Sequence, residues 1–80
     1  MIVIKAKTIE QWHAILDYYF AKGYTWEYFS RSYCDFNFKR GRQLIFEDDK
    51  SISWATGGMF RETITYDEIM MMKKKRGNKS

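Results

Sequence analysis

The spacing of hydrophobic residues changes at Gly23 from a helical period to an alternating one. At the start of the chain, the β-branched run Ile2–Ile4 predicts a short strand. Between Thr8 and Lys22, apolar residues recur every three or four positions, which predicts an amphipathic helix lying on a sheet. Thr8 and Gln11 have the spacing of an N-terminal capping box, and Gly23 suits the left-handed residue that follows a helix.

After Gly23, apolar and polar residues alternate as they do in strands. The alternation predicts strands over residues 24–29, 33–38, 43–46 and 52–54, with a fifth over 63–66. Turns are expected at Lys39–Arg42, where Gly41 suits a tight hairpin, and at Asp48–Ser51. Thr65 and Glu68 repeat the capping-box spacing, so a short helix is expected from near Tyr66 to Met72.

This order of elements predicts one small α+β domain. Its expected parts are an N-terminal strand, one amphipathic helix packed on an antiparallel meander sheet of four to five strands, and a short C-terminal helix. The domain is expected to cover residues 1–72, and residues 73–80 to form a basic flexible tail. A chain of 80 residues with 45% hydrophobic and 19% aromatic residues is too rich in apolar groups for a disordered protein. Its longest apolar runs are far shorter than the about 20 residues of a membrane span.

The net charge of +4 comes from the C-terminus. Nine basic and ten acidic residues lie in the rest of the chain. The other five of the 14 basic residues lie at the C-terminus: Lys73, Lys74, Lys75, Arg76 and Lys79. A body that is close to neutral argues against a general polyanion binder, because such modules place their basic groups on a structured face. The tail is interpreted either as a solvated end or as a salt-sensitive arm for nucleic acid.

The sequence lacks the groups that catalysis and metal binding require. One cysteine and one histidine cannot form a four-ligand zinc site. Cys34 is expected in the core and His13 at its rim, while the adjacent acids Asp48–Asp49 and Asp67–Glu68 suit a turn and a helix start. We expect no enzymatic activity, no metal and no cofactor. A single cysteine also favours a reducing compartment, the cytoplasm.

Aromatic residues outnumber what one small core can hold, so some are expected on the surface, where protein interfaces favour them. The alternative is that the second sheet face is covered by Met59–Phe60 and the last helix. The Lys39–Arg42 turn is expected to present three basic side chains at a hairpin tip, as a partner contact or as a solvated turn. The expected partner-binding residues are Tyr28, Tyr33, Lys39, Arg40, Arg42 and Trp54.

In layout, the chain resembles small uncharacterised proteins of bacteriophages and prophages. The resemblance rests on four stretches: IKAKTIEQW (4–12), KGYTW (22–26), LIFEDDKSISW (44–54) and ITYDEI (64–69). Members of that group with a known role often bind and block a host protein, including defence enzymes such as CRISPR nucleases. The resemblance implies this class of biology, in the cytoplasm of an infected bacterium, and no catalytic or site residues.

The leading hypothesis is therefore a non-enzymatic phage or prophage protein that binds a host protein and inhibits it, in the manner of an anti-CRISPR protein. The alternative is a small nucleic-acid-binding accessory protein that uses the 39–42 turn together with Lys73, Lys74, Lys75 and Arg76. A third is self-association through a sheet edge. No membrane partner is expected.

Overall fold

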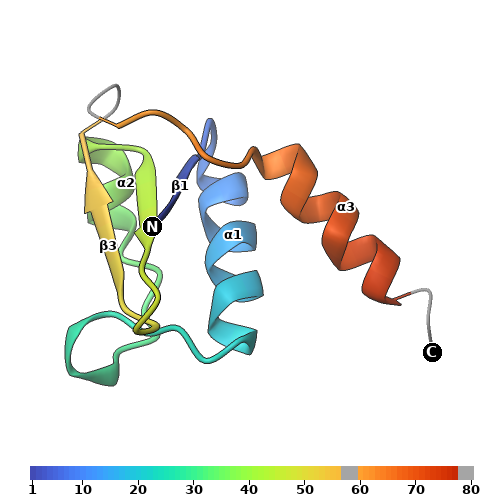
Figure 1. Cartoon of the computed structure of the whole chain (residues 1–80). Helices are drawn as coiled ribbons and strands as arrows, with labels where there is room; N and C mark the ends of the chain where they lie inside the picture. The colour runs from blue at the N-terminus through green and yellow to red at the C-terminus, as the bar shows by residue number, and fades with distance from the viewer. Residues whose placement is uncertain (57–59, 78–80) are drawn as a thin grey trace.

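A three-stranded antiparallel sheet with helices packed against it forms the fold (Figure 1). The computed structural model describes the backbone of residues 1–56 and 60–77 and the side chains of residues 1–56 and 60–73. In chain order the elements are β1 (Ile2–Lys5), α1 (Ile9–Ala21), the 3-10 turn η1 (Glu27–Phe29), α2 (Asp35–Arg40), β2 (Gln43–Phe46), β3 (Ile52–Ala55) and α3 (Tyr66–Gly77). The sheet order is β1-β2-β3. The α+β class is confirmed, but within the described residues the sheet has three strands, so the prediction of four to five was wrong.

Helix α1 begins where the capping pattern predicts. The Thr8 hydroxyl oxygen accepts a hydrogen bond from the Gln11 backbone N–H at 3.1 Å. The Gln11 side-chain oxygen accepts from the N–H of Lys7, at 3.0 Å, one residue before the cap. Two of the N–H groups near the helix start thus have partners that do not depend on tertiary packing.

The end of α1 is closed by a Schellman motif at Gly23, which has a φ of 96°. The N–H of Tyr24 donates to the Tyr19 carbonyl at 3.0 Å, and the N–H of Gly23 donates to that of Phe20 at 3.0 Å. The Tyr24 ring then packs edge-on against Tyr19, with centroids 5.0 Å apart. The prediction of a helix ending at Gly23 is confirmed, and the motif also fixes where Tyr24 lies.

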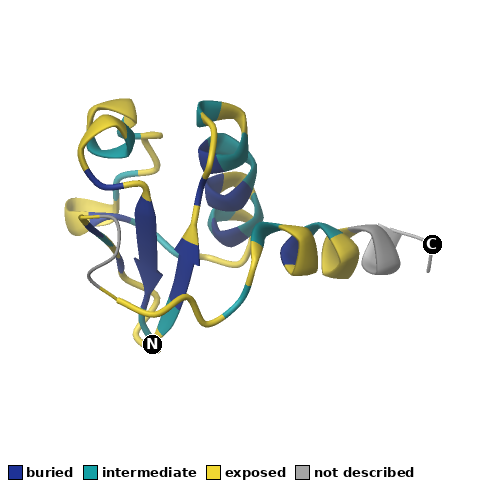
Figure 2. Ribbon diagram, turned by 90° about the horizontal axis from the view of Figure 1, so that it is seen from above, coloured by how far each residue is buried: buried dark blue, intermediate teal, exposed yellow. Residues whose placement is uncertain are grey.

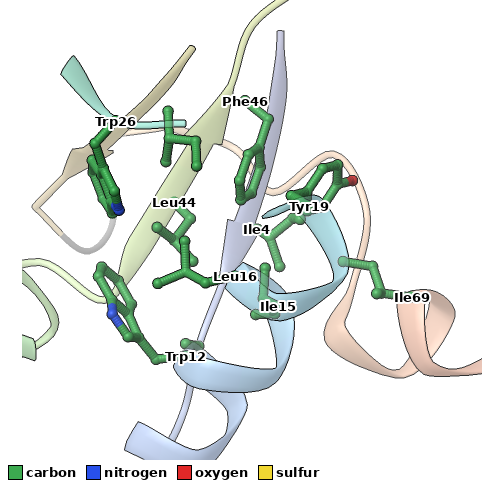
Figure 3. Packing of buried hydrophobic residues seen from close by; sticks show 11 residues of the cluster. Ile4, Trp12, Ile15, Leu16, Tyr19, Trp26, Leu44, Phe46 and Ile69 are labelled. Atoms are coloured by element: carbon green, nitrogen blue, oxygen red, sulfur yellow. The ribbon is translucent and has the colours of Figure 1, made fainter. Parts of the chain in front are cut away.

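The main core lies between α1 and the sheet (Figure 3). Side chains of β1, β2 and β3 meet the buried stripe of α1, joined by one tryptophan from the following loop and one isoleucine from α3: Ile4, Trp12, Ile15, Leu16, Tyr19, Trp26, Leu44, Phe46, Ile52 and Ile69. Tyr19 stacks on Phe46 with ring centroids 3.8 Å apart. Each large buried side chain stabilises the fold by roughly 2–3 kcal/mol.

The second sheet face holds a smaller cluster of Val3, Ile45 and Ala55. Beside it, the side chain of Gln43, only 3% exposed, forms two hydrogen bonds with the backbone of Phe60. Its amide group donates to the Phe60 carbonyl at 2.7 Å, and its oxygen accepts from the Phe60 N–H at 3.3 Å. The segment after β3 is therefore held against this face at Phe60, whereas Met59 lies outside the described residues.

Beyond Phe60 the chain runs along the outer edge of β1. The N–H of Thr63 donates to the Val3 carbonyl at 2.8 Å, and the Glu62 carboxylate accepts from the N–H of Lys5 at 3.0 Å. These bonds do not form a ladder, so the expected fifth strand over residues 63–66 was wrong. α3 packs on α1 and projects away from the sheet (Figures 1 and 2), so this helix does not cover the second face.

The strands expected over residues 24–29 and 33–38 were also wrong. The first segment folds around the buried Trp26, whose backbone N–H donates to the Ser30 carbonyl at 2.9 Å and whose indole N–H donates to the Ser32 carbonyl at 2.8 Å. The second contains α2. Cys34 and Phe38 pack against the core, and Phe36 between them is 66% exposed. A four-residue separation brings two side chains to one side of a helix, whereas in a strand Phe36 would share their face.

Residues 39–42 form no hairpin tip, which corrects the expected turn. Lys39 and Arg40 end α2, and Gly41 and Arg42 lead into β2. Gly41 is required by a close approach, because a Cβ atom there would lie 2.1 Å from the Ala55 carbonyl oxygen. The β2–β3 hairpin instead uses the predicted Asp48–Ser51 turn, in which the N–H of Lys50 donates to the Glu47 carbonyl at 3.0 Å.

The start of α3 confirms the second capping box. The Glu68 carboxylate accepts from the Thr65 N–H at 3.0 Å, and the Thr65 hydroxyl oxygen accepts from the Glu68 N–H at 3.1 Å. The helix runs to Gly77, so residues 73–77, which were expected in the tail, have helical backbone. The expectation for residues 78–80 lies outside the described residues.

Candidate functional site

The loop at η1 presents two neighbouring aromatic side chains to solvent. Tyr28 is 92% exposed and Phe29 is 89% exposed. Both residues have left-handed backbones, with φ of 61° and 62°. Tyrosine and phenylalanine rarely adopt this conformation, since each L-residue with a Cβ pays roughly 1–2 kcal/mol to do so.

The loop that holds these rings is fixed at its base. The N–H of Phe29 donates to the carbonyl of the buried Trp26 at 3.1 Å. Thr25 ties the loop to the β2–β3 hairpin, because its N–H donates to the Lys50 carbonyl and its carbonyl accepts from the N–H of Ile52, both at 3.0 Å. Tyr28 and Phe29 therefore project from a loop with a defined backbone.

An open groove of about 750 Å³ runs between this loop, α2 and β3. Its lining includes Tyr28 and Phe29 on one side, Cys34 and Asn37 on another, and Trp54 of β3. Of the six expected partner-binding residues, the structure thus brings Tyr28 and Trp54 together in one groove. No single sequence segment contributes all of these rings.

Tyr33 lies elsewhere, against α1. Its hydroxyl donates to the Asp17 carboxylate at 2.7 Å, and its ring stacks on His13 at 4.1 Å. His13 also lies 2.7 Å from the Asp35 carboxylate, so this cluster ties the start of α2 to α1. The hydrogen bond to Asp17, which accepts the hydroxyl proton, raises the pKa of Tyr33 above its ordinary value. Tyr33 is 38% exposed, and its fixed partners give it a structural role between α1 and α2.

The basic residues in the last turn of α2 and just after it, Lys39, Arg40 and Arg42, are exposed and lie outside the groove lining. The Arg40 guanidinium lies over the Phe36 ring at 4.9 Å, and that of Arg42 lies over Phe38 at 5.2 Å. These contacts orient the two arginines, because a cation is attracted to an aromatic face. With Lys39 they form a basic edge on the α2 side of the molecule.

The sequence pattern left open which rings after Gly23 would be exposed, either Tyr24, Trp26 and Tyr28 or Phe29 with its partners, because it assigned these two sets to opposite faces of a strand. It did not indicate Phe36 as a surface aromatic. The hydrogen bonds around Trp26 set the left-handed backbone at Tyr28 and Phe29, and the local sequence pattern does not predict these bonds. Phe36 could have been found from the helical spacing of Cys34 and Phe38.

A second hollow, of about 650 Å³, lies where α1 ends. It is lined by three lysines, two tyrosines, one acid and one small residue: Asp17, Tyr18, Ala21, Lys22, Tyr24, Lys50 and Lys73. Lys73 was expected to bind nucleic acid in the alternative hypothesis. The side chains of Lys74, Lys75 and Arg76 lie outside the described ones.

In the part of the chain that the structure describes, no three His, Cys, Asp or Glu side chains gather as a metal site would require. The half-buried Cys34 packs against the core, and its thiol lies 3.8 Å from the Ser32 hydroxyl. No helix among these residues has the length and apolar character needed to cross a membrane.

Comparison of the chain with protein-family models, with curated proteins and with solved structures finds no match.

Proposed function

We propose that this chain is a non-enzymatic protein that binds a protein partner through Tyr28, Phe29 and the adjoining groove, and acts by occluding the partner's surface. The single observation that supports the proposal is the pair of almost fully exposed rings on left-handed backbone. The resemblance to phage and prophage proteins suggests that the partner is a host protein and that binding inhibits it.

The energetics favour binding over a structural role for these rings. Exposed at about nine-tenths of their surface, Tyr28 and Phe29 contribute little burial to the fold. Their backbone conformation costs free energy that the rest of the loop must offset, and strained residues of this kind cluster at functional sites. Large rings on a fixed loop lose little conformational entropy on binding, which suits interface anchors.

The groove favours an apolar, protruding feature of the partner, because Trp54 lies in its lining and flat aromatic rings stand at its rim. On the α2 side, Lys39, Arg40 and Arg42 would pair with acidic groups at the edge of the contact, where charges select and steer partners. The rings supply the affinity in this proposal, and the basic edge supplies orientation.

The test is partner capture from a bacterial host lysate by tagged protein, compared between the wild type, Tyr28→Asn/Phe29→Asn and Met71→Asn. Met71→Asn is the control, since it removes a 73% exposed apolar side chain on α3, outside the groove lining. The proposal predicts a stoichiometric partner that the double variant loses and the control retains. Equal capture by all three proteins, or loss by both variants, would place the binding surface elsewhere and refute the role of these rings.

A further inference from the structure

The basic hollow at the end of α1 is a second concave feature of the surface, lined by three lysines. We infer that it is a site for the phosphate backbone of single-stranded nucleic acid, with Lys22, Lys50 and Lys73 as the phosphate-binding groups. The inference is separate from the protein-binding proposal, because Lys22 and Lys73 lie outside the groove lining and only Lys50 lines both hollows.

Three lysines reach this hollow from separate parts of the fold. Lys22 is the C-terminal cap of α1, Lys50 lies in the β2–β3 turn, and Lys73 lies on α3. Asp17 is the acid in the lining, and its carboxylate already accepts the Tyr33 hydroxyl proton. The lining therefore bears a net charge of +2 although the body of the chain is close to neutral.

The aromatic walls hold two of the ammonium groups in place. The Lys22 ammonium lies 4.9 Å from the centre of the Tyr18 ring, and the Lys50 ammonium lies 4.8 Å from that of Tyr24. Lys50 also donates a hydrogen bond to the Lys22 carbonyl oxygen at 3.2 Å. The two like charges are thus held in the lining of one hollow, and an anion bound there would stabilise them.

The backbone at Lys50 is the second observation. Lys50 has a φ of 70° at the hairpin position where Gly or Asn is the usual residue. A lysine at this position accepts a strained conformation, and its side chain reaches the cleft. The strained backbone at Lys50 therefore favours a binding role for its charge in the hollow.

The chemistry of the donors suits phosphate. The lining has three lysines, and lysine binds phosphate as a point charge. The cleft is concave, which fits a strand and not the flat surface of a membrane.

The experiment is a fluorescence-anisotropy titration of the full chain with labelled oligo(dT) and oligo(U) over a range of NaCl concentrations. Three phosphate contacts predict a slope of log K against log[NaCl] of about −2 for a single strand. In the triple variant Lys22→Gln/Lys50→Gln/Lys73→Gln we expect binding at least about tenfold weaker at low salt, with the slope approaching zero.

The matched control is Lys39→Gln/Arg40→Gln/Arg42→Gln, which removes the same amount of charge from the basic edge. Its affinity and slope should stay within about twofold of the wild type. Lys73→Gln alone, at an exposed position on α3, removes one contact without threatening the fold and should reduce the slope by about 0.7.

Three outcomes would overturn the inference. One is no binding of either oligonucleotide at 50 mM NaCl. Another is equal weakening by the two triple variants, which would indicate net charge alone. The third is binding to vesicles containing phosphatidylserine but to neither oligonucleotide, which would show that the cleft binds a membrane surface. Near-UV circular dichroism of every variant verifies that the fold is retained.

Discussion

The double replacement Tyr28→Asn/Phe29→Asn tests whether the η1 loop stores strain for the sake of its two rings. Asparagine is a residue that visits the left-handed region routinely. The replacement therefore keeps the backbone conformation, removes both rings and relieves part of the conformational cost. In an ordinary loop, by contrast, losing two aromatic side chains would destabilise the protein.

The magnitude follows from the exposures. With Tyr28 92% and Phe29 89% exposed, each ring hides on the order of 20 Å² in the folded state, worth at most about 0.5 kcal/mol. Relief of left-handed strain is worth roughly 1 kcal/mol for each residue. The net expectation is a gain of about 1 kcal/mol in the free energy of unfolding, which raises the Tm by about 4–8 °C in a domain of this size.

The assay is urea denaturation followed by tryptophan fluorescence, together with thermal unfolding followed by circular dichroism. The midpoint should rise while the m-value stays constant, because the surface exposed on unfolding hardly changes. Trp26→Ala is the contrasting variant, since this buried side chain anchors the same loop, and a loss of about 3–5 kcal/mol is expected. A loss of more than about 1 kcal/mol in the double Asn variant would show that the rings support the fold and would refute the reasoning.

Three further predictions concern the fold. Gly41→Ala should cost about 2 kcal/mol or more, because its Cβ would lie 2.1 Å from a backbone oxygen, whereas Gly23→Ala should cost only about 1 kcal/mol of conformational strain; urea midpoints that rank these two variants in the opposite order would contradict this. Thr65→Ala should cost about 1 kcal/mol and reduce helical circular dichroism, since the N-terminal cap of α3 is lost, and an unchanged spectrum would count against that role. Burial, followed by the neighbouring Tyr18 and Tyr24, raises the pKa of Tyr19 to about 12 from an ordinary value of 10.0. The folded state therefore retains this proton more tightly, so stability is full below pH 10 and falls by on the order of 2 kcal/mol as the pH rises from 10 to 12. Denaturation curves of Tyr19→Phe should lack this component, and a variant with the same alkaline loss as the wild type would refute the assignment.

The sequence was a good guide wherever local interactions determine the structure. The helix between Thr8 and Gly23 follows from its apolar period, from the Thr8–Gln11 capping spacing and from a glycine at the left-handed position after its end, and both ends form as expected. The start of α3 follows from Thr65 and Glu68 for the same reason. Strands β2 and β3 follow from alternation next to an acidic turn whose residues bond their own backbone.

The segment between Gly23 and Gly41 could not be predicted from its own pattern. Trp26 and Trp12 each donate an indole N–H to a backbone carbonyl of residues 32–33, and these bonds fold the segment into a loop and a short helix. Such bonds join residues up to 21 positions apart, so alternation within the segment contains no information about them. The two surfaces proposed for binding could not be predicted from the local sequence pattern for the same reason.

By itself the sequence determined that the chain forms a small α+β domain, where its main helix begins and ends, and that it has more rings than a core can hold. Only the tertiary structure decided which rings remain outside and which lysines converge. The burial of Trp26 forces Tyr28 and Phe29 outward on left-handed backbone, and the packing of α1, the β2–β3 turn and α3 brings three lysines into one cleft. Local preference acts over a few residues, whereas these placements depend on contacts between elements that are distant in the chain.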